Sequence, residues 1–113
     1  KLPLQIRVYE ITGPLFFGAA DAIEYIVVKD FTTCLILRMR SVPALDSTAL
    51  NALQNLTKVC ESKGITLVFS HVNEQPMKVM VKSGFVDLVG KENFCPNIRA
   101  ALDHAEKIIA TAK

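Results

Sequence analysis

The chain has 113 residues, of which 50% are hydrophobic, and its formal net charge is +2. This length is enough for one domain whose hydrophobic core needs no disulfide or metal, and we expect residues 1–113 to form a single domain. Because the charges nearly cancel and the lysines and arginines are scattered along the chain, the composition gives no sign of a nucleic-acid-binding protein, and we expect no nucleic-acid partner.

The first third of the chain contains strand patterns and one helix pattern. Residues 5–11 combine alternating apolar positions with β-branched side chains and predict a strand that ends before Gly13-Pro14. Residues 15–17 form a short apolar run consistent with a second strand, and residues 19–29 carry apolar residues at helical spacing. Residues 34–39 form a nearly continuous apolar run, which predicts a strand covered on both faces.

The middle of the chain alternates helix and strand patterns. Residues 47–62 predict a helix with one apolar face, and Gly64 marks its end. The expected core positions of this helix are Leu50, Leu53, Leu56, Val59 and Cys60. Residues 65–69 repeat the buried-strand pattern, and residues 74–82 predict another helix. Its inward-facing residues are expected to be Met77, Met80 and Val81.

The last part of the chain completes the alternation. Residues 86–89 predict a weak strand, residues 90–96 predict a loop, and Asn97 is placed to cap a final helix with a continuous apolar face. Strands that alternate with helices imply right-handed crossovers and parallel pairing. We therefore expect an α/β fold, with a mixed, mostly parallel sheet of about four to five strands and about four helices.

The junction between residues 34–39 and residues 47–62 carries the most suggestive side chains. Asp46 stands just before the helical pattern, where a short oxygen-bearing side chain is the usual N-cap. Ser47 and Thr48 then fall in the first helical turn, where the helix dipole favours an anion or an added phosphate. These residues are either a site that a partner reads or modifies, or only a polar helix start.

Cysteines and histidines point to no metal or cofactor. Cys34, Cys60 and Cys95 are odd in number and far apart, which favours reduced thiols over a disulfide framework. His71 and His104 have no second ligand at metal spacing. The apolar runs are also much shorter than the roughly 18 residues of a membrane span, and no signal-peptide pattern is present. We expect a soluble chain exposed to the cytosol.

Four stretches in this order resemble the STAS domain: YEITGPLFFGAA at 9–20, LILRMRSVP at 35–43, DSTAL at 46–50 and GKENF at 90–94. This domain is shared by sulfate-type anion transporters and bacterial anti-sigma factor antagonists. The first stretch is typical of transporter-attached members, so the chain looks most like the cytoplasmic C-terminal domain of bacterial SulP transporters. Only residues 30–33 fill the place of a long insertion found notably in animal members, which suggests a bacterial or similarly compact origin.

The resemblance implies a non-catalytic regulatory and protein-interaction domain of a SulP-family transporter of sulfate, bicarbonate, a dicarboxylate or another anion. The chain would then be excised from a larger membrane protein and would lie at the cytoplasmic face of the inner membrane. Its expected partners are the membrane domain of its own transporter, a soluble cytosolic protein, or both.

The alternative within the family is a free-standing anti-sigma factor antagonist. In that branch a serine or threonine at the position of Thr48 is phosphorylated by a partner kinase. Here Ala49 stands where the family often has glycine, which departs from the phosphoswitch pattern. Phe16, Phe17 and Phe94 also argue for the transporter branch by resemblance.

A third reading is an enzyme or a nucleotide-binding domain, since parallel sheets bind ligands at the carboxyl ends of their strands. The chain has no glycine-rich phosphate loop and no spaced serine, histidine and acid set, so no motif supports nucleotide binding, and we expect no catalysis. We place a candidate partner surface at Phe16, Phe17, His71 and Met77, because consecutive phenylalanines point to opposite faces of a strand and a methionine suits an adaptable contact.

Overall fold

The computed structural model describes residues 5–12 and 32–111. The strand expected at 15–17, the helix expected at 19–29, and the candidate contact residues Phe16 and Phe17 lie outside these ranges.

A parallel sheet forms the centre of the described structure. Its strands are β1 (Ile6–Thr12), β2 (Cys34–Ser41), β3 (Thr66–Ser70) and β4 (Phe94–Cys95), in the order β1-β2-β3-β4. Each pair of neighbours is parallel, and Cys34 of β2 lies opposite Ile6 on one side and Thr66 on the other. The α/β fold class with a parallel sheet is therefore confirmed.

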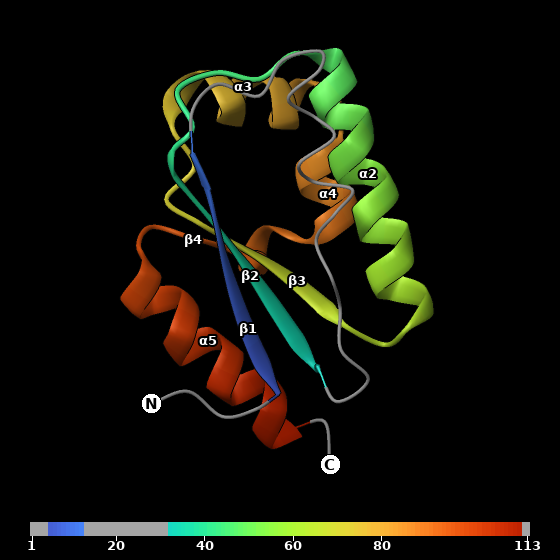
Figure 1. Ribbon diagram of the computed structural model, residues 1–113, viewed down its shortest axis with the longest axis vertical. Helices are drawn as coiled ribbons and strands as arrows, with labels where there is room; N and C mark the ends of the chain where they lie inside the picture. The colour runs from blue at the N-terminus through green and yellow to red at the C-terminus, as the bar shows by residue number, and fades with distance from the viewer. Residues whose placement is uncertain (1–4, 13–31, 112–113) are drawn as a thin grey trace.

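Helices cover both faces of the sheet, as Figure 1 shows. They are α2 (Ser47–Ser62), α3 (Glu74–Lys82), α4 (Phe85–Val89) and α5 (Ile98–Thr111), with a short 3-10 helix η1 (Lys91–Asn93) before β4. α2, α3 and α4 pack on one face, and α5 packs on the other.

The two helical layers enclose two cores because successive residues of β2 point to opposite faces of the sheet. Leu35, Leu37 and Met39 pack toward α2, α3 and α4, whereas Cys34 and Ile36 pack toward α5. All five are completely buried, as the nearly continuous apolar run of residues 34–39 predicts.

Local sequence signals placed two helices correctly. α2 and α3 begin and end at the predicted residues 47–62 and 74–82. Two of their expected inward residues were wrong: Val59 is 46% exposed and Val81 is 60% exposed. Val59 lies at the rim of the buried face of α2, and Val81 lies one residue, or about 100° of helical rotation, past the buried Met80.

The region after α3 differs from the sequence-based expectation. The predicted strand 86–89 is the helix α4, and the predicted loop 90–96 contains both η1 and β4. The reason lies in Phe85, which is fully buried and meets the ring of Phe69 edge to face at 5.6 Å. Phe94 stacks on Phe69 from β4 at 5.0 Å. This aromatic packing outweighs the strand propensity of the valines in α4.

Candidate functional site

The candidate site is the loop from β2 to α2, at the carboxyl ends of the parallel strands. After Ser41 the chain makes a turn in which the Val42 N–H donates to the carbonyl of Met39 at 2.9 Å. Val42 and Leu45 are buried, so their side chains anchor the loop to the core. Asp46 follows directly.

Asp46 is the N-cap of α2, as the sequence predicts. Its Oδ1 accepts a hydrogen bond from the Ala49 N–H at 3.0 Å, and its backbone is extended, with φ −108° and ψ −177°. Its carbonyl accepts from the Leu50 N–H at 3.0 Å, which begins the helical ladder. The carboxylate thereby satisfies one of the backbone donors that a helix start leaves without a partner.

Ser47 and Thr48 occupy the first turn of α2, and both are exposed. Ala49 and Leu50, which follow them, are buried against the core. The junction therefore divides sharply between hydroxyls that face the solvent and apolar side chains that hold the helix. Both hydroxyl residues are therefore accessible from solvent.

Two side-chain amides at the start of α3, one at its N-cap position and one in its first turn, hold this loop, and the sequence did not reveal them. The first is Gln75, whose Oε1 accepts from the Leu45 N–H at 2.9 Å and whose Nε2 donates to the Leu45 carbonyl at 3.2 Å. Gln75 thus pairs with both backbone groups of the residue just before Asp46.

The second amide belongs to Asn73. Its Nδ2 donates to the carbonyls of Arg40 at 2.9 Å and Val42 at 2.8 Å. Asn73 stands at the N-cap position of α3, yet its side chain does not cap that helix, since it is directed at the β2–α2 loop instead. These contacts join residues more than 30 positions apart in the chain, so no local pattern could reveal them.

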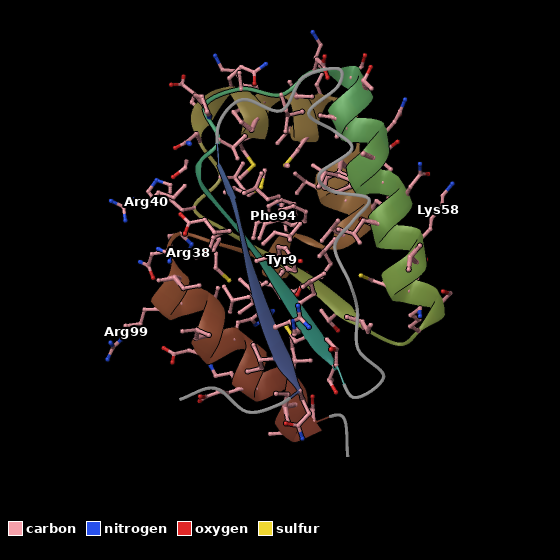
Figure 2. All side chains as sticks on the ribbon, in the orientation of Figure 1. Tyr9, Arg38, Arg40, Lys58, Phe94 and Arg99 are labelled. Atoms are coloured by element: carbon pink, nitrogen blue, oxygen red, sulfur yellow. The ribbon has the colours of Figure 1, made fainter. Side chains whose placement is uncertain are left out.

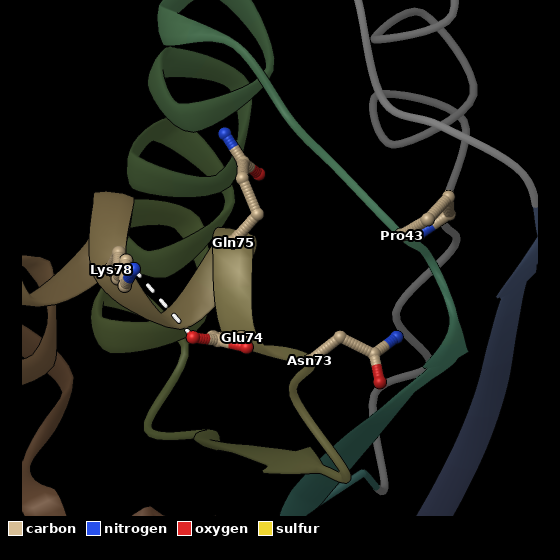
Figure 3. Close-up of a pocket in the computed structure, with 5 residues that line it drawn as sticks. All are labelled: Pro43, Asn73, Glu74, Gln75 and Lys78. Carbon is tan, nitrogen blue, oxygen red and sulfur yellow. Dashed lines mark ion pairs between the residues drawn. The ribbon is translucent and has the colours of Figure 1, made fainter.

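A hollow of about 550 Å³ lies beside this loop, between Pro43 and the start of α3. Figure 3 shows the residues that line it: Pro43, Asn73, Glu74, Gln75 and Lys78. Lys78 and Glu74 form an ion pair at 3.6 Å, but both side chains are highly exposed, so the pair adds little stability. The hollow widens the candidate surface from Asp46 toward α3.

The other candidate residues fall into different environments. His71 is exposed one residue after β3, with a left-handed backbone (φ 56°), and its N–H donates to the Cys95 carbonyl at 2.9 Å. It therefore lies, like the β2–α2 loop, at the carboxyl ends of the parallel strands. Met77 is partly buried and packs against the core.

The cysteine thiols are poorly suited to chemistry. Burial raises the pKa of Cys34 from 9.0 to about 12 and that of Cys60 to about 11, and it also raises the pKa of Cys95. Within residues 5–12 and 32–111, no group of three or more potential metal ligands comes together. In the same ranges, no helix has the length and apolar character that crossing a bilayer demands.

The comparison with protein families decides the identity of the fold. The STAS domain model matches residues 3–103. The chain belongs to the STAS domain family. Solved structures agree: a sulfate transporter family protein from Wolinella succinogenes has a TM-score of 0.90 at 34% identity, with 97% of this chain and 92% of that chain covered. A SulP transporter STAS domain from Vibrio cholerae has a TM-score of 0.81 at 32% identity, with 98% and 88% covered.

Curated relatives of this STAS domain are sulfate transporters. The probable sulfate transporter 4.2 of Arabidopsis thaliana is 30% identical over 86% of this chain and 16% of its own length. The putative sulfate transporter YvdB of Bacillus subtilis is 29% identical over 91% of this chain and 19% of its own length. The chain therefore spans less than a fifth of these relatives. The resemblance to SulP transporter STAS domains is confirmed.

Proposed function

We propose that this STAS domain is a non-catalytic cytoplasmic regulatory domain of a SulP-type anion transporter, and that it contacts its partner through the β2–α2 loop. The observation that carries the proposal is the exposure of Ser47 and Thr48 in the first turn of α2, directly after a loop that Asn73 and Gln75 fix. The relatives named as sulfate transporters support it, and sulfate is therefore the first anion to test.

A loop of this kind suits recognition because it is already ordered. Four hydrogen bonds from the two amides hold the backbone of Arg40, Val42 and Leu45. A preorganised surface loses little conformational entropy when a partner binds, and so more of the contact energy appears as affinity. The partner is the membrane domain of the same transporter or a soluble cytosolic protein.

The side chains of the loop support binding rather than catalysis. Within the described ranges, neither hydroxyl of Ser47 and Thr48 is hydrogen-bonded to a histidine or another base that would activate it. His71 also lies at the carboxyl ends of the strands, but within the described ranges its side chain forms no hydrogen bond to the loop. A parallel sheet by itself confers no chemistry.

The test uses a full-length transporter that carries this domain. Two assays are applied to it: anion uptake, and co-purification of the partner (partner capture). Thr48→Trp places a bulky group at the centre of the proposed contact, and Asn55→Trp, on an exposed position of the same helix, is the matched control. Loss of a central contact weakens binding by about 2 kcal/mol, or roughly thirtyfold. We expect Thr48→Trp to alter uptake and partner capture while Asn55→Trp does not. Equal behaviour of the two variants in both assays contradicts the proposal.

Phosphorylation of Thr48 is a second, separable part of the proposal. The first turn of α2 favours negative charge, whereas the neighbouring Asp46 carboxylate repels it. A phosphate on Thr48 would therefore alter the charge of the contact surface and disturb the N-cap beside it. Phosphopeptide mass spectrometry of protein from its native host tests this part. Detection of unmodified Thr48 alone, under every growth condition, excludes it and also removes the free-standing antagonist as an alternative.

A further inference from the structure

Three arginines that are scattered in the sequence gather on one side of the molecule. Arg38 and Arg40 are alternate residues of β2, so they leave the same face of the strand as Ile36, which packs toward α5. Arg99 stands in the first turn of α5. Figure 2 shows the three side chains on the same side, opposite Lys58 of α2. We call Arg38, Arg40 and Arg99 the arginine face.

Among the described residues, no ion pair neutralises the positive charge of the arginine face. In this part of the chain, the one ion pair joins Lys78 and Glu74, both on α3. Glu10 lies opposite Arg38 in the strand register and Asp103 follows Arg99 by one helical turn, but no ion pair joins them to the arginines. The positive end of the α5 dipole lies beside Arg99 and adds to the positive potential.

Within residues 5–12 and 32–111, the arginine face has charge but no exposed large hydrophobic side chain. The exposed large hydrophobic residues Val59, Val81 and Leu88 are on α2, α3 and α4, which cover the opposite face of the sheet. The described aromatic residues Tyr9, Phe69, Phe85 and Phe94 also pack in that opposite core. A protein interface relies on such anchors, and single-stranded nucleic acid requires aromatic stacking. Charge alone suits a surface made of phosphate groups, which guanidinium groups bind in bidentate fashion.

We propose that the arginine face binds the anionic phospholipid headgroups of the membrane that holds the transporter. The proposal rests on the proposed function, because attachment to a membrane protein keeps the domain close to such a surface. Contact with the bilayer would limit the orientations of the domain and so help to present the β2–α2 loop to its partner. Screening by salt weakens the attraction, since these are exposed charges.

The test measures co-sedimentation of this chain with vesicles of phosphatidylglycerol and phosphatidylcholine in equal parts, at low ionic strength, against vesicles of phosphatidylcholine alone. The variant Arg40→Gln with Arg99→Gln removes two exposed positive charges from the arginine face. Lys58→Gln with Lys63→Gln removes two from α2 and its C-cap, and is the matched control. Circular dichroism verifies that each variant is folded.

We expect the wild-type chain to bind the phosphatidylglycerol vesicles and not those of phosphatidylcholine alone. Each basic residue near an anionic bilayer raises partitioning by a factor of about five, so the arginine variant should bind roughly twentyfold more weakly, and the lysine control much less so. Absence of binding by the wild type, or equal loss in both variants, overturns the proposal. Arginine-dependent binding to soluble polyglutamate without binding to vesicles overturns it in favour of an acidic protein.

Failure of the membrane-binding proposal can be distinguished from failure of the proposed function. If vesicle binding is absent while Thr48→Trp still alters uptake in the full-length transporter, only the membrane contact is wrong. If vesicle binding depends on the arginines while Thr48→Trp has no effect, the β2–α2 loop is not the partner surface.

Discussion

The side-chain amide of Gln75 forms hydrogen bonds to both the N–H and the carbonyl of Leu45, at 2.9 Å and 3.2 Å. Leu45 is buried and immediately precedes the N-cap Asp46. A residue in α3 therefore fixes the point at which α2 begins, and the shape of the candidate surface depends on a contact across 30 residues of chain.

Replacement of Gln75 by alanine should destabilise the domain. It removes the side-chain partner of the Leu45 N–H and carbonyl. Because Gln75 is exposed and both hydrogen bonds are only partly buried, water can reach these groups, and we expect a loss of about 0.5–1.5 kcal/mol. Urea unfolding measures the change in free energy. Gln54→Ala, on a half-buried position of α2, is the control and should change the free energy of unfolding by much less. Similar losses in the two variants would show that the Leu45 contact adds nothing.

Asn73 provides a test that separates hydrogen bonding from packing. Asn73→Asp keeps the size of the side chain but replaces the Nδ2 donor with a carboxylate oxygen that faces the carbonyls of Arg40 and Val42. Asn73→Ala only removes the donor. At neutral pH we therefore expect the aspartate variant to be the less stable of the two in urea unfolding, with each change costing about 1–3 kcal/mol. The opposite order would show that these carbonyls do not depend on the Asn73 donor.

The capping role of Asp46 can be measured directly. Asp46→Ala removes the acceptor of the Ala49 N–H and should lower the free energy of unfolding by about 1 kcal/mol, whereas Asp46→Asn and Asp46→Ser keep an acceptor and should lose less. Chemical denaturation of the three variants provides the comparison. If the alanine variant is as stable as the asparagine and serine variants, the acceptor for the Ala49 N–H contributes nothing to stability.

The buried thiols should make the domain sensitive to alkali. The pKa of Cys34 is about 12 in the folded protein and 9.0 ordinarily, so above about pH 9 the unfolded chain loses this proton first. The free energy of unfolding then falls with rising pH by about 1.4 kcal/mol per unit for this thiol, up to the folded pKa.

Cys34→Ala removes the contribution of this thiol to the pH dependence of stability. Urea unfolding of the wild type and the variant at about pH 8 and about pH 10 measures that contribution. The cavity left by alanine is the same at both pH values, so it cancels in the difference. We expect the wild type to lose more stability than the variant between the two. A parallel loss in both would exclude Cys34 as the source. Ellman's reagent should also react slowly with Cys34 and Cys60 in the native protein, because both are buried and protonated.

Gly90 and Gly64 allow a comparison between a crowded and an uncrowded glycine of positive φ. Both have positive φ, at 106° and 71°, which side chains rarely adopt. An added Cβ at Gly90 would lie 3.0 Å from Glu92 Oε2 and 3.2 Å from Asn93 Nδ2, whereas at Gly64 it would meet nothing within 4 Å.

Gly90→Ala should therefore destabilise the domain more than Gly64→Ala does. Gly64→Ala measures the cost of a positive φ without crowding, about 1 kcal/mol. The excess at Gly90 combines the crowding of Glu92 and Asn93 with the greater strain of its backbone, at φ 106° and ψ 124°. Asn93 Oδ1 lies 2.8 Å from His104 Nε2, so the crowding should also loosen the contact between η1 and α5. Thermal unfolding of both variants gives the comparison, and equal shifts would show that neither the crowding nor the backbone conformation of Gly90 adds a cost.

Only the tertiary structure determined the arrangement between β3 and α5. The valines of residues 86–89 predicted a strand, but the ring of Phe85 packs on Phe69 and a helix forms there instead. Phe94 and Cys95, in an expected loop, add the fourth strand because β3 offers them an unpaired edge. Propensities act over a few neighbours, whereas these outcomes depend on partners far away in the chain.

The sequence by itself determined the parallel α/β class, the bounds of α2 and α3, and the caps at Asp46 and Asn97, whose side chain accepts from the Ala100 N–H. These features follow from helical periodicity and from hydrogen bonds within one turn, so a short window of residues is sufficient to specify them. The amide contacts of Asn73 and Gln75 with the β2–α2 loop, and the gathering of Arg38, Arg40 and Arg99, were decided only in three dimensions. Strand register and helix packing bring those residues together, and no local pattern encodes either.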